Sequence, residues 1–278
     1  MNNIYIIGEI GINHNGELAL AKKMIDMAID SGCNAVKFQK REVEKVIPKD
    51  MWNVKKETPY GIVNYIEYKK GIELSKNDYI TLKKYCDDKG IDFLASAWDL
   101  DSLEFIESLK PKFHKLASPM LRDKEFVNKI SSYGREVLIS TGMSTIEEID
   151  DIVNIFKENN CPYTLLHCVS VYPCPDELLN LKAIETLRER YKCNIGYSGH
   201  SSGIQDGIIA CTLGARVIEK HITLDRSMFG SDQSSSIEST GLKRMIRDIR
   251  LLDTIYGSGD KTKLSNEELK VREKLYGR

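Results

Sequence analysis

The sequence predicts a single-domain (β/α)8 barrel. Short β-branched runs alternate with amphipathic stretches eight times along the 278 residues, and a barrel of this kind has about this length. The connections between most runs are short, which favours parallel strands joined by helices. A doubly wound open sheet shows the same alternation and stays the alternative. The text after the first run, Gly8-Glu9-Ile10-Gly11, lacks the G-x-G-x-x-G pattern of dinucleotide-binding sheets.

The eight predicted strands are nearly continuous apolar segments. This pattern is typical of parallel strands that are buried on both faces, whereas half-exposed strands alternate polar and apolar residues. The predicted strands are residues 4–8, 34–39, 91–96, 113–117, 136–140, 163–168, 194–197 and 216–221.

Helical periodicity fills the gaps between these strands. In 17–31, for example, Leu18, Ala21, Met24 and Ile25 fall on one face. The other helices are expected in 146–158 and near 76–89, 100–108, 123–132, 181–190, 203–213 and 239–256. These elements complete a catalytic barrel over residues 1–256. Residues 257–278 are polar and are expected to form a tail with one short helix.

One connection, residues 40–75, is much longer than the others. Loops of this length are usually functional or partly ordered. In a barrel this segment follows the second strand and therefore lies at the C-terminal face, where active sites of this fold are built.

Composition excludes several classes of protein. The net charge is −1, from 40 basic and 41 acidic residues, which provides no field for holding nucleic acid. The sequence has no run of 18 apolar residues, so we expect no membrane span. The seven cysteines are scattered and include no C-x-x-C pair, which indicates free thiols and a cytoplasmic location.

Two histidines are candidates for metal ligands. His200 follows the seventh strand and His221 ends the eighth. Neighbouring strands lie about 4.8 Å apart, so two imidazoles at their ends can share one divalent ion, with positions left for water and substrate. The alternative is that one or both are hydrogen-bonded core histidines.

Lysines and hydroxyls at other strand ends suggest an anion site. Ser96, Lys115, Ser118, Ser140 and Ser198 follow or end strands and can surround a phosphate with donors. Each serine alone can instead cap the following helix. Polar residues at strand ends also include Asn13, His14, Asp99, His167 and Glu219.

Lys37 lies inside the second strand, and lysine is rarely buried without a partner. It therefore indicates an anionic ligand or a Schiff base. Glu9 is the nearest candidate counter-charge, so a purely structural Lys37–Glu9 pair is the alternative reading.

The sequence resembles the sialic acid (N-acetylneuraminate) synthase family. The resemblance spans residues 4 to about 240, and its motifs occur in the family's order. They are Gly8-Glu9-Ile10-Gly11-Ile12-Asn13-His14-Asn15-Gly16, Val36-Lys37-Phe38-Gln39, Lys115-Leu116-Ala117-Ser118, Ile139-Ser140-Thr141-Gly142-Met143, Leu166-His167-Cys168, Tyr172-Pro173-Cys174-Pro175, Gly196-Tyr197-Ser198-Gly199-His200, Glu219-Lys220-His221-Ile222-Thr223-Leu224-Asp225 and Gly230-Ser231-Asp232.

The resemblance implies a (β/α)8 barrel that condenses phosphoenolpyruvate with an aldose such as N-acetylmannosamine and releases phosphate. His200 and His221 match the metal ligands, with Mn²⁺ expected and Mg²⁺ or Co²⁺ as alternatives. Positions that hold phosphoenolpyruvate are matched by Lys37, Lys115, Ser118, Ser140 and Ser198. Positions near the metal or the sugar are matched by Glu9, Gln39, Tyr172 and Asp232. Glu9 is the candidate for moving the proton of the water or the aldehyde.

Two departures from the family put the sugar pocket in doubt. Relatives carry a C-terminal antifreeze-like domain that contributes to sugar binding and to the dimer, and this sequence ends at Arg278, where that domain would begin. We expect either a short form or a shortened chain, with a homodimer through barrel surfaces. The segment Ala95-Ser96-Ala97-Trp98-Asp99 also differs from the Ser-Thr-Pro-Phe of relatives, and Gly199 replaces a common Asp.

Three alternatives to a nonulosonate-type synthase remain at this point. The first is the same chemistry on a different or phosphorylated aldose, which basic residues of 40–75 turning inward would favour. The second is a metal-dependent pyruvate aldolase, which needs no phosphate-binding hydroxyls. The third is a non-catalytic barrel, although such a chain would be expected to have lost some of the site residues.

Overall fold

The eight predicted strands form a closed parallel barrel. The computed structural model describes residues 4–277, and the strand order around the barrel is β1-β10-β9-β8-β7-β6-β5-β2. The barrel strands are β1 (Tyr5–Gly11), β2 (Ala35–Lys40), β5 (Asp92–Ala97), β6 (His114–Leu116), β7 (Val137–Ser140), β8 (Tyr163–Cys168), β9 (Asn194–Gly199) and β10 (Val217–His221). Closure between β1 and β10 confirms the barrel and excludes the doubly wound alternative.

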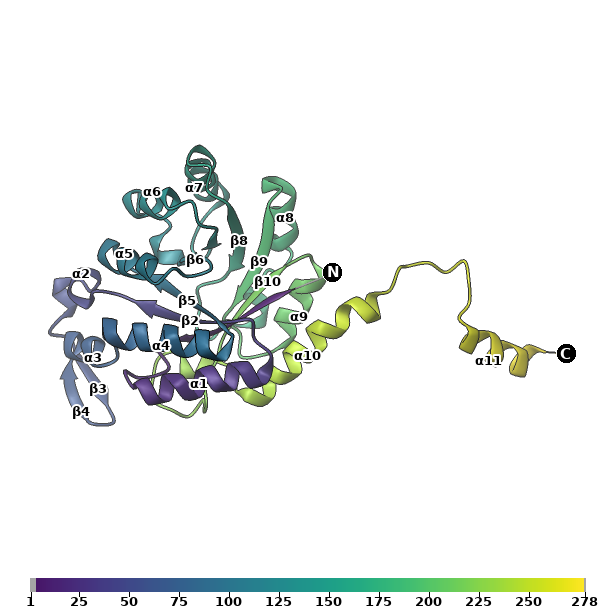
Figure 1. Ribbon diagram of the computed structural model, residues 1–278, viewed down its shortest axis with the longest axis horizontal. Coiled ribbons are helices and arrows are strands. Elements are labelled where there is room, and N and C mark those ends of the chain that lie inside the picture. The colour runs from purple at the N-terminus through teal and green to yellow at the C-terminus, as the bar shows by residue number, and fades with distance from the viewer. Residues whose placement is uncertain (1–3, 278) are drawn as a thin grey trace.

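Eight helices follow the strands and cover the outside of the barrel (Figure 1). They are α1 (Leu18–Ser31), α4 (Lys76–Lys89), α5 (Leu100–Ser108), α6 (Lys124–Ser132), α7 (Ile146–Glu158), α8 (Ala183–Tyr191), α9 (Gln205–Thr212) and α10 (Ser239–Tyr256). Every helix expected from periodicity is present, with ends shifted by a few residues at most. The main core lies between these helices and the outward-facing side chains of the strands, such as Ile6, Val36, Phe38 and Phe93.

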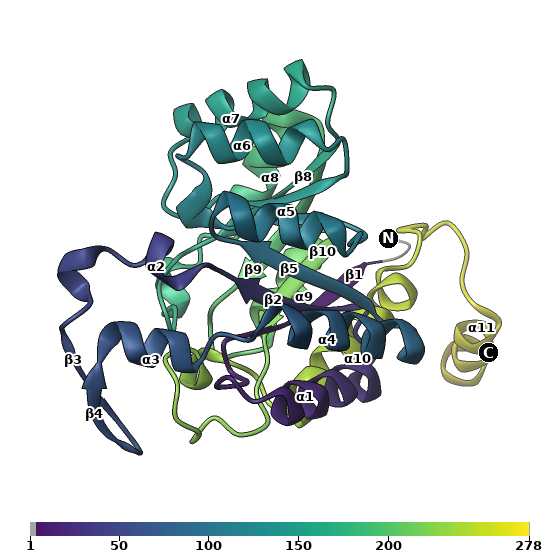
Figure 2. The ribbon, with the colours of Figure 1, turned by 60° about the vertical axis from the view of Figure 1, so that its left-hand side comes forward.

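The long connection after β2 forms a small subdomain, which we call the insertion (residues 41–75). It contains α2 (Val43–Val46), a 3-10 turn (Lys49–Met51), an antiparallel hairpin of β3 (Lys55–Thr58) and β4 (Gly61–Asn64), and α3 (Tyr65–Gly71). Figure 2 shows it projecting from one side of the barrel. A small apolar cluster of Ile12, Tyr68 and Ile72 attaches it to the loop after β1.

The C-terminal tail contains α11 (Asn266–Tyr276), which has no buried residue and lies apart from the barrel in Figure 1. This matches the short helix expected there, while the domain boundary at residue 256 stays a prediction. Within residues 4–277, no helix combines the length and apolar character needed to cross a bilayer.

The interior of the barrel is built in layers, because inward side chains recur every second residue along a strand. The lower layer is apolar and consists of Ile7, Ala35, Leu94, Leu138, Leu166 and Val217. Two residues further along the same strands stand Glu9, Lys37, Ser96, Ser140, Cys168 and Glu219. The barrel therefore changes from apolar to charged within one side-chain layer, and this change sets the depth of the site.

Gly196 offers a test of packing in the lower layer. A Cβ at this position would lie 2.6 Å from the carbonyl oxygen of Val217 and would also clash with the Leu166 side chain. We expect Gly196→Ala to lower the free energy of unfolding by about 1–3 kcal/mol, measured by denaturant or thermal unfolding. Gly71→Ala is the matched control, since nothing lies within 4 Å of its added Cβ. Equal stability of the two variants would contradict the layer packing described above.

Candidate functional site

A cavity of about 350 Å³ opens at the C-terminal ends of the barrel strands. All twelve side chains singled out from the sequence line it, which brings together residues from the first strand to the loop after the last. They are Glu9, Lys37, Gln39, Ser96, Lys115, Ser118, Ser140, Tyr172, Ser198, His200, His221 and Asp232. The structure thus assembles one site from these positions, while the role of each residue stays a prediction.

The floor of the cavity is a buried cluster of opposite charges. Lys37 Nζ lies 2.9 Å from Glu9 Oε2 and 3.6 Å from Glu219 Oε1. All three residues are less than 5% exposed. The β-sheet register causes this meeting, because Glu9 pairs with Lys37 on one side and β10 supplies Glu219 from the other. A lysine buried at this depth is stabilised by carboxylates on both sides.

The two carboxylates of the floor have opposite proton affinities. Burial raises the pKa of Glu9 to about 7, although Lys37 opposes the shift. Burial also acts on Glu219, but the positive charges of Lys115 and Lys37 outweigh it and hold the pKa of Glu219 at about 2. Near neutral pH, Glu9 is therefore the carboxyl group that can take up and release a proton, and Glu219 stays charged.

Donors surround the upper side of this floor. Lys115 Nζ donates to Ser140 Oγ at 2.6 Å, and burial lowers the pKa of Lys115. Ser198 Oγ donates to Glu219 Oε1 at 3.0 Å, and the Gly142 amide donates to Ser118 Oγ at 3.1 Å. Two lysines and three hydroxyls in one cavity suit an anion that carries several oxygen atoms.

The two histidines lie together above the floor. Their ring centroids are 5.4 Å apart, and the ring of Tyr172 lies 4.0 Å from that of His200. His200 Nδ1 lies 2.7 Å from the Val169 carbonyl oxygen, so it carries a proton and leaves Nε2 as the electron-pair donor. Burial lowers the pKa of His221, which favours the neutral form that binds metals.

These histidines fit a divalent ion. His221 Nδ1 is buried and has no hydrogen-bond partner among the described residues, and Asp232 Oδ2 lies 3.9 Å from it. No group of three or more His, Cys, Asp or Glu side chains in residues 4–277 is arranged as a complete ligand set. The chain therefore offers two imidazoles, which leaves positions for water and substrate, as in catalytic rather than structural sites.

A second buried ion pair supports the strand ends that carry the histidines. Lys220 lies next to His221 on the outward face of β10, and its Nζ contacts Asp206 Oδ2 at 2.9 Å and the Ser201 carbonyl oxygen at 2.8 Å. Asp206 also accepts from the Tyr197 hydroxyl at 2.8 Å. Since Ser201 follows His200, this network ties the loop after β9 to β10 and to α9 and fixes the spacing of the two imidazoles.

Several strand-end residues do not reach the cavity, although the sequence placed them near it. Asn13 bonds to the Ile222 carbonyl and to Ser236, and His14 accepts from the Gly16 amide at 3.0 Å. Asp99 caps the N-terminus of α5, and His167 contacts the Leu179 carbonyl. Their polar groups serve the local backbone, which corrects their assignment to the mouth of the barrel.

The lining of the cavity also includes Arg41, Lys69 and Trp98, which were not among the predicted site residues. Arg41 and Lys69 belong to the insertion, whose internal fold the barrel pattern does not describe. Trp98 lies in the segment that departs from the family's usual text, and basic residues of 40–75 were anticipated only as a class, as the condition that would favour a phosphorylated aldose.

Several known proteins are similar to this chain over most of its length. The sequence matches the NeuB family over residues 24–261. It is 36% identical over 277 residues to the N-acetylneuraminate-9-phosphate synthase of Homo sapiens, covering 98% of this chain and 76% of that protein. It is 34% identical over 280 residues to the N,N'-diacetyllegionaminic acid synthase of Campylobacter jejuni, covering 98% and 83%.

A solved structure shows the same architecture. The N-acetylneuraminic acid synthetase of Leptospira borgpetersenii, in complex with citrate, superposes with a TM-score of 0.86 at 33% identity, covering 100% of this chain and 94% of that one. The chain therefore belongs to the NeuB family and is an enzyme of the nonulosonic acid synthase type, which forms a carbon–carbon bond from phosphoenolpyruvate.

Proposed function

We propose that this enzyme condenses phosphoenolpyruvate with an N-acetylmannosamine-like aldose to give a 3-deoxy-2-keto sugar acid and phosphate. The proposal rests mainly on the presence of an anion site and a pair of imidazoles in the same cavity. An anion site built on Lys37 and Lys115 lies at the floor, and a pair of imidazoles stands above it.

In this proposal phosphoenolpyruvate occupies the floor. Lys37, Lys115 and the hydroxyls of Ser118, Ser140 and Ser198 supply donors for its carboxylate and phosphate, and Ser96 lies beside them. These donors are buried side chains, so they act at a lower effective dielectric than in water, where fixed donors stabilise developing charge most strongly. A pyruvate aldolase would have no use for a second lysine and three hydroxyls, and this favours the synthase.

The aldose lies above, with its aldehyde toward the histidines. Enzymes of this family depend in general on a metal, and His200 and His221 are the residues that would hold it. We propose Mn²⁺, with Mg²⁺ or Co²⁺ as alternatives. When bound, such an ion supplies Lewis acidity to the aldehyde oxygen. Gln39, Tyr172 and Asp232 line the same part of the cavity and are suited to orient the sugar hydroxyls.

Glu9 is the group that moves protons in the proposed reaction. C3 of phosphoenolpyruvate bonds to the aldehyde carbon, water adds at C2, and the adduct loses phosphate with cleavage of the C–O bond. Glu9 Oε1 accepts from Gln39 Nε2 at 3.0 Å and Oε2 faces Lys37, so the carboxyl group is held in one orientation. With a pKa raised to about 7 by burial, it can accept the proton that the water loses on adding to C2 and pass it to the former aldehyde oxygen, which becomes a hydroxyl group.

Phosphate release from phosphoenolpyruvate with Mn²⁺ should depend on an added aldose, tested with N-acetylmannosamine, its 6-phosphate, hexoses and pentoses. Pyruvate in place of phosphoenolpyruvate should give no condensation product by mass spectrometry. Product from pyruvate would favour an aldolase, and no release with any of these aldoses would refute the proposed reaction for this chain.

His221→Ala should weaken Mn²⁺ binding, measured by calorimetry, by more than about 100-fold, because loss of even an outer-sphere partner costs 10- to 100-fold. Treatment with a chelator should likewise abolish phosphate release. The control is His167→Asn, a buried histidine that bonds to a backbone carbonyl outside the cavity. Unchanged Mn²⁺ affinity in His221→Ala would exclude this residue as a ligand.

A base must be ionised, and the pKa of Glu9 is about 7, so kcat/KM for the aldose at saturating phosphoenolpyruvate should fall as the pH drops below about 7. Glu9→Gln should lose roughly 10²- to 10⁴-fold in rate. The residual kcat/KM of this variant should not show the fall below about pH 7. A fall that comes from titration of a substrate would persist in the variant. The same fall in both enzymes would exclude Glu9 as the titrating group.

A further inference from the structure

The mouth of the cavity has a cationic wall that the proposed reaction does not use. Arg41 follows β2 and Lys69 lies on α3, and both side chains line the cavity. We propose that Arg41 and Lys69 bind an anionic substituent, a phosphate or a carboxylate, at the end of the aldose remote from its aldehyde. This inference rests on the proposed function, because it names the class of aldose that the enzyme accepts.

Arg41 is held in place as a preformed anion ligand. It is only 6% exposed, and its guanidinium carbon lies 4.6 Å from the ring centroid of Trp98. One terminal nitrogen donates to Gln39 Oε1, which joins it to the residue that contacts Glu9. Its Nε is buried and has no hydrogen-bond partner among residues 4–277, with Glu73 3.7 Å away. The planar donors of a fixed guanidinium match the oxygens of a carboxylate or phosphate.

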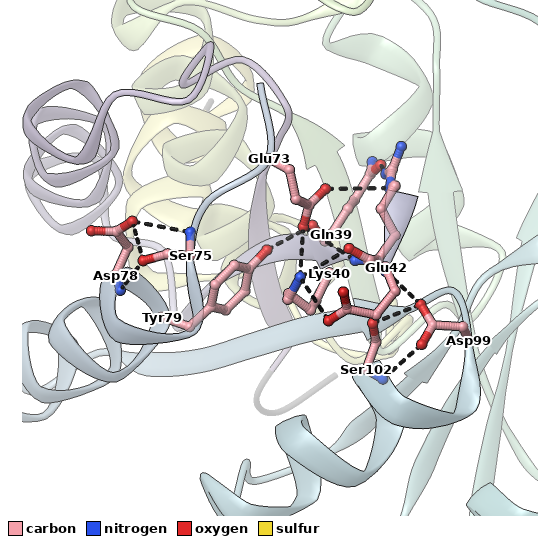
Figure 3. Close-up of polar contacts among 10 residues, drawn as sticks. Gln39, Lys40, Glu42, Glu73, Ser75, Asp78, Tyr79, Asp99 and Ser102 are labelled. Atoms are coloured by element: carbon pink, nitrogen blue, oxygen red, sulfur yellow. Dashed lines mark hydrogen bonds and ion pairs between the residues drawn. The ribbon is translucent and has the colours of Figure 1, made fainter. Parts of the chain in front are cut away.

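Glu73 does not neutralise this wall by itself. Figure 3 shows Glu73 beside Lys40, and its Oε1 lies 3.3 Å from Lys40 Nζ and accepts from the Arg41 amide at 3.1 Å. Tyr79 closes the same network by donating to the Gln39 carbonyl at 2.6 Å. The carboxylate is thus shared between two cations and a backbone amide. Lys40 also contacts Glu42 Oε1 at 3.7 Å. The two carboxylates anchor the base of the insertion to the end of β2, but they leave Arg41 Nε without a hydrogen bond.

Lys69 faces Arg41 without a carboxylate of its own. Its Nζ lies 5.3 Å from the Tyr65 ring and 5.7 Å from the Tyr68 ring, and no ion pair joins it to a carboxylate in the described part of the chain. Burial, and next the charge of Arg41, lower the pKa of Lys69. Two cations that repel each other across a cavity wall are stabilised when an anion lies between them.

The position of this wall assigns it to the aldose. Arg41 follows the end of β2 and Lys69 lies on α3 of the insertion, so both side chains enter the cavity from beyond the strand ends, whereas Lys37 and Lys115 lie within β2 and β6. Phosphoenolpyruvate held by the two strand lysines therefore leaves the Arg41–Lys69 side of the cavity to the aldose. At the floor two carboxylates face two lysines, but at the mouth Asp232 is the one carboxylate among the lining residues beside Arg41 and Lys69.

The test compares neutral and anionic aldoses in matched variants. In the native enzyme, KM should be lower for N-acetylmannosamine 6-phosphate, or for an aldose with a terminal carboxylate, than for N-acetylmannosamine. Lys69→Gln and Arg41→Gln should each raise KM for the preferred anionic aldose about 10- to 100-fold, as expected for a lost charged hydrogen bond. KM for phosphoenolpyruvate should change less than about threefold. Comparing the phosphate with the carboxylate sugar identifies which anion the wall accepts.

Lys56→Gln is the control, because Lys56 belongs to the same insertion and contacts Tyr68 but does not line the cavity. Melting temperatures establish that each variant is folded, and Lys69→Gln breaks no hydrogen bond that the Arg41 network needs. Equal KM values for neutral and anionic aldoses would overturn the proposal. A rise in KM for phosphoenolpyruvate alone would overturn it too, because the wall would then serve that substrate.

Failure of this inference is distinguishable from failure of the proposed reaction. Binding of the 6-phosphate sugar by calorimetry requires no turnover. Binding that weakens in Lys69→Gln supports the anion site even if no aldose yields phosphate, an outcome that would refute the reaction alone. Turnover of neutral aldoses without measurable binding of the anionic ones would refute the anion site but not the proposed reaction.

Discussion

The structure depends on the buried charges of Glu9, Lys37 and Glu219 meeting at one level inside the barrel. Removing one partner from a buried ion pair costs about 3–5 kcal/mol, since the other charge is left without compensation. All three side chains are under 5% exposed, and each charge would destabilise the fold if it were buried there without the others. The closure of β1 between β2 and β10 brings them together. Closing the barrel and assembling the floor of the site are therefore the same event.

The apolar layer beneath the charges allows the fold to accept them. Side chains such as Ile7, Leu94 and Leu166 fill the lower interior, and the larger core between strands and helices is independent of the site. The charged layer replaces only the upper part of the interior. The Lys220–Asp206 pair repeats the arrangement on the outside of β9 and β10, where it fixes the loop behind His200. The apolar layers thus supply most of the stability, and the charged layer, once its members are paired, sets the geometry of the site.

Most of the barrel could be predicted from the sequence because buried parallel strands are continuous apolar runs. This pattern can be recognised without knowing which strands pair with each other. His200 and His221 could be placed together because successive strands of a barrel are neighbours. Lys37 required a counter-charge, which identified Glu9. Asn13 and His14 were misplaced for a local reason. The β1–β2 register shifts between Glu9 and Gly11, and Gly11 has a φ of +56°, so the chain turns out of the strand before these residues.

Arg41 and Lys69 could not be predicted for a different reason. Their approach to the cavity depends on the hairpin and helix of the insertion, which follow no barrel periodicity and attach through the small cluster around Tyr68. The floor is made of strands whose positions the closed sheet determines, but the mouth is made of segments that can change without disturbing the barrel. The relatives differ in the sugar acid that their names give, N-acetylneuraminate-9-phosphate, N,N'-diacetyllegionaminic acid or pseudaminic acid. This architecture therefore permits a rigid floor for phosphoenolpyruvate and a mouth that can change to suit a different aldose. Selection for a new aldose can act on the insertion and on the segment around Trp98 while the charges at the floor stay paired.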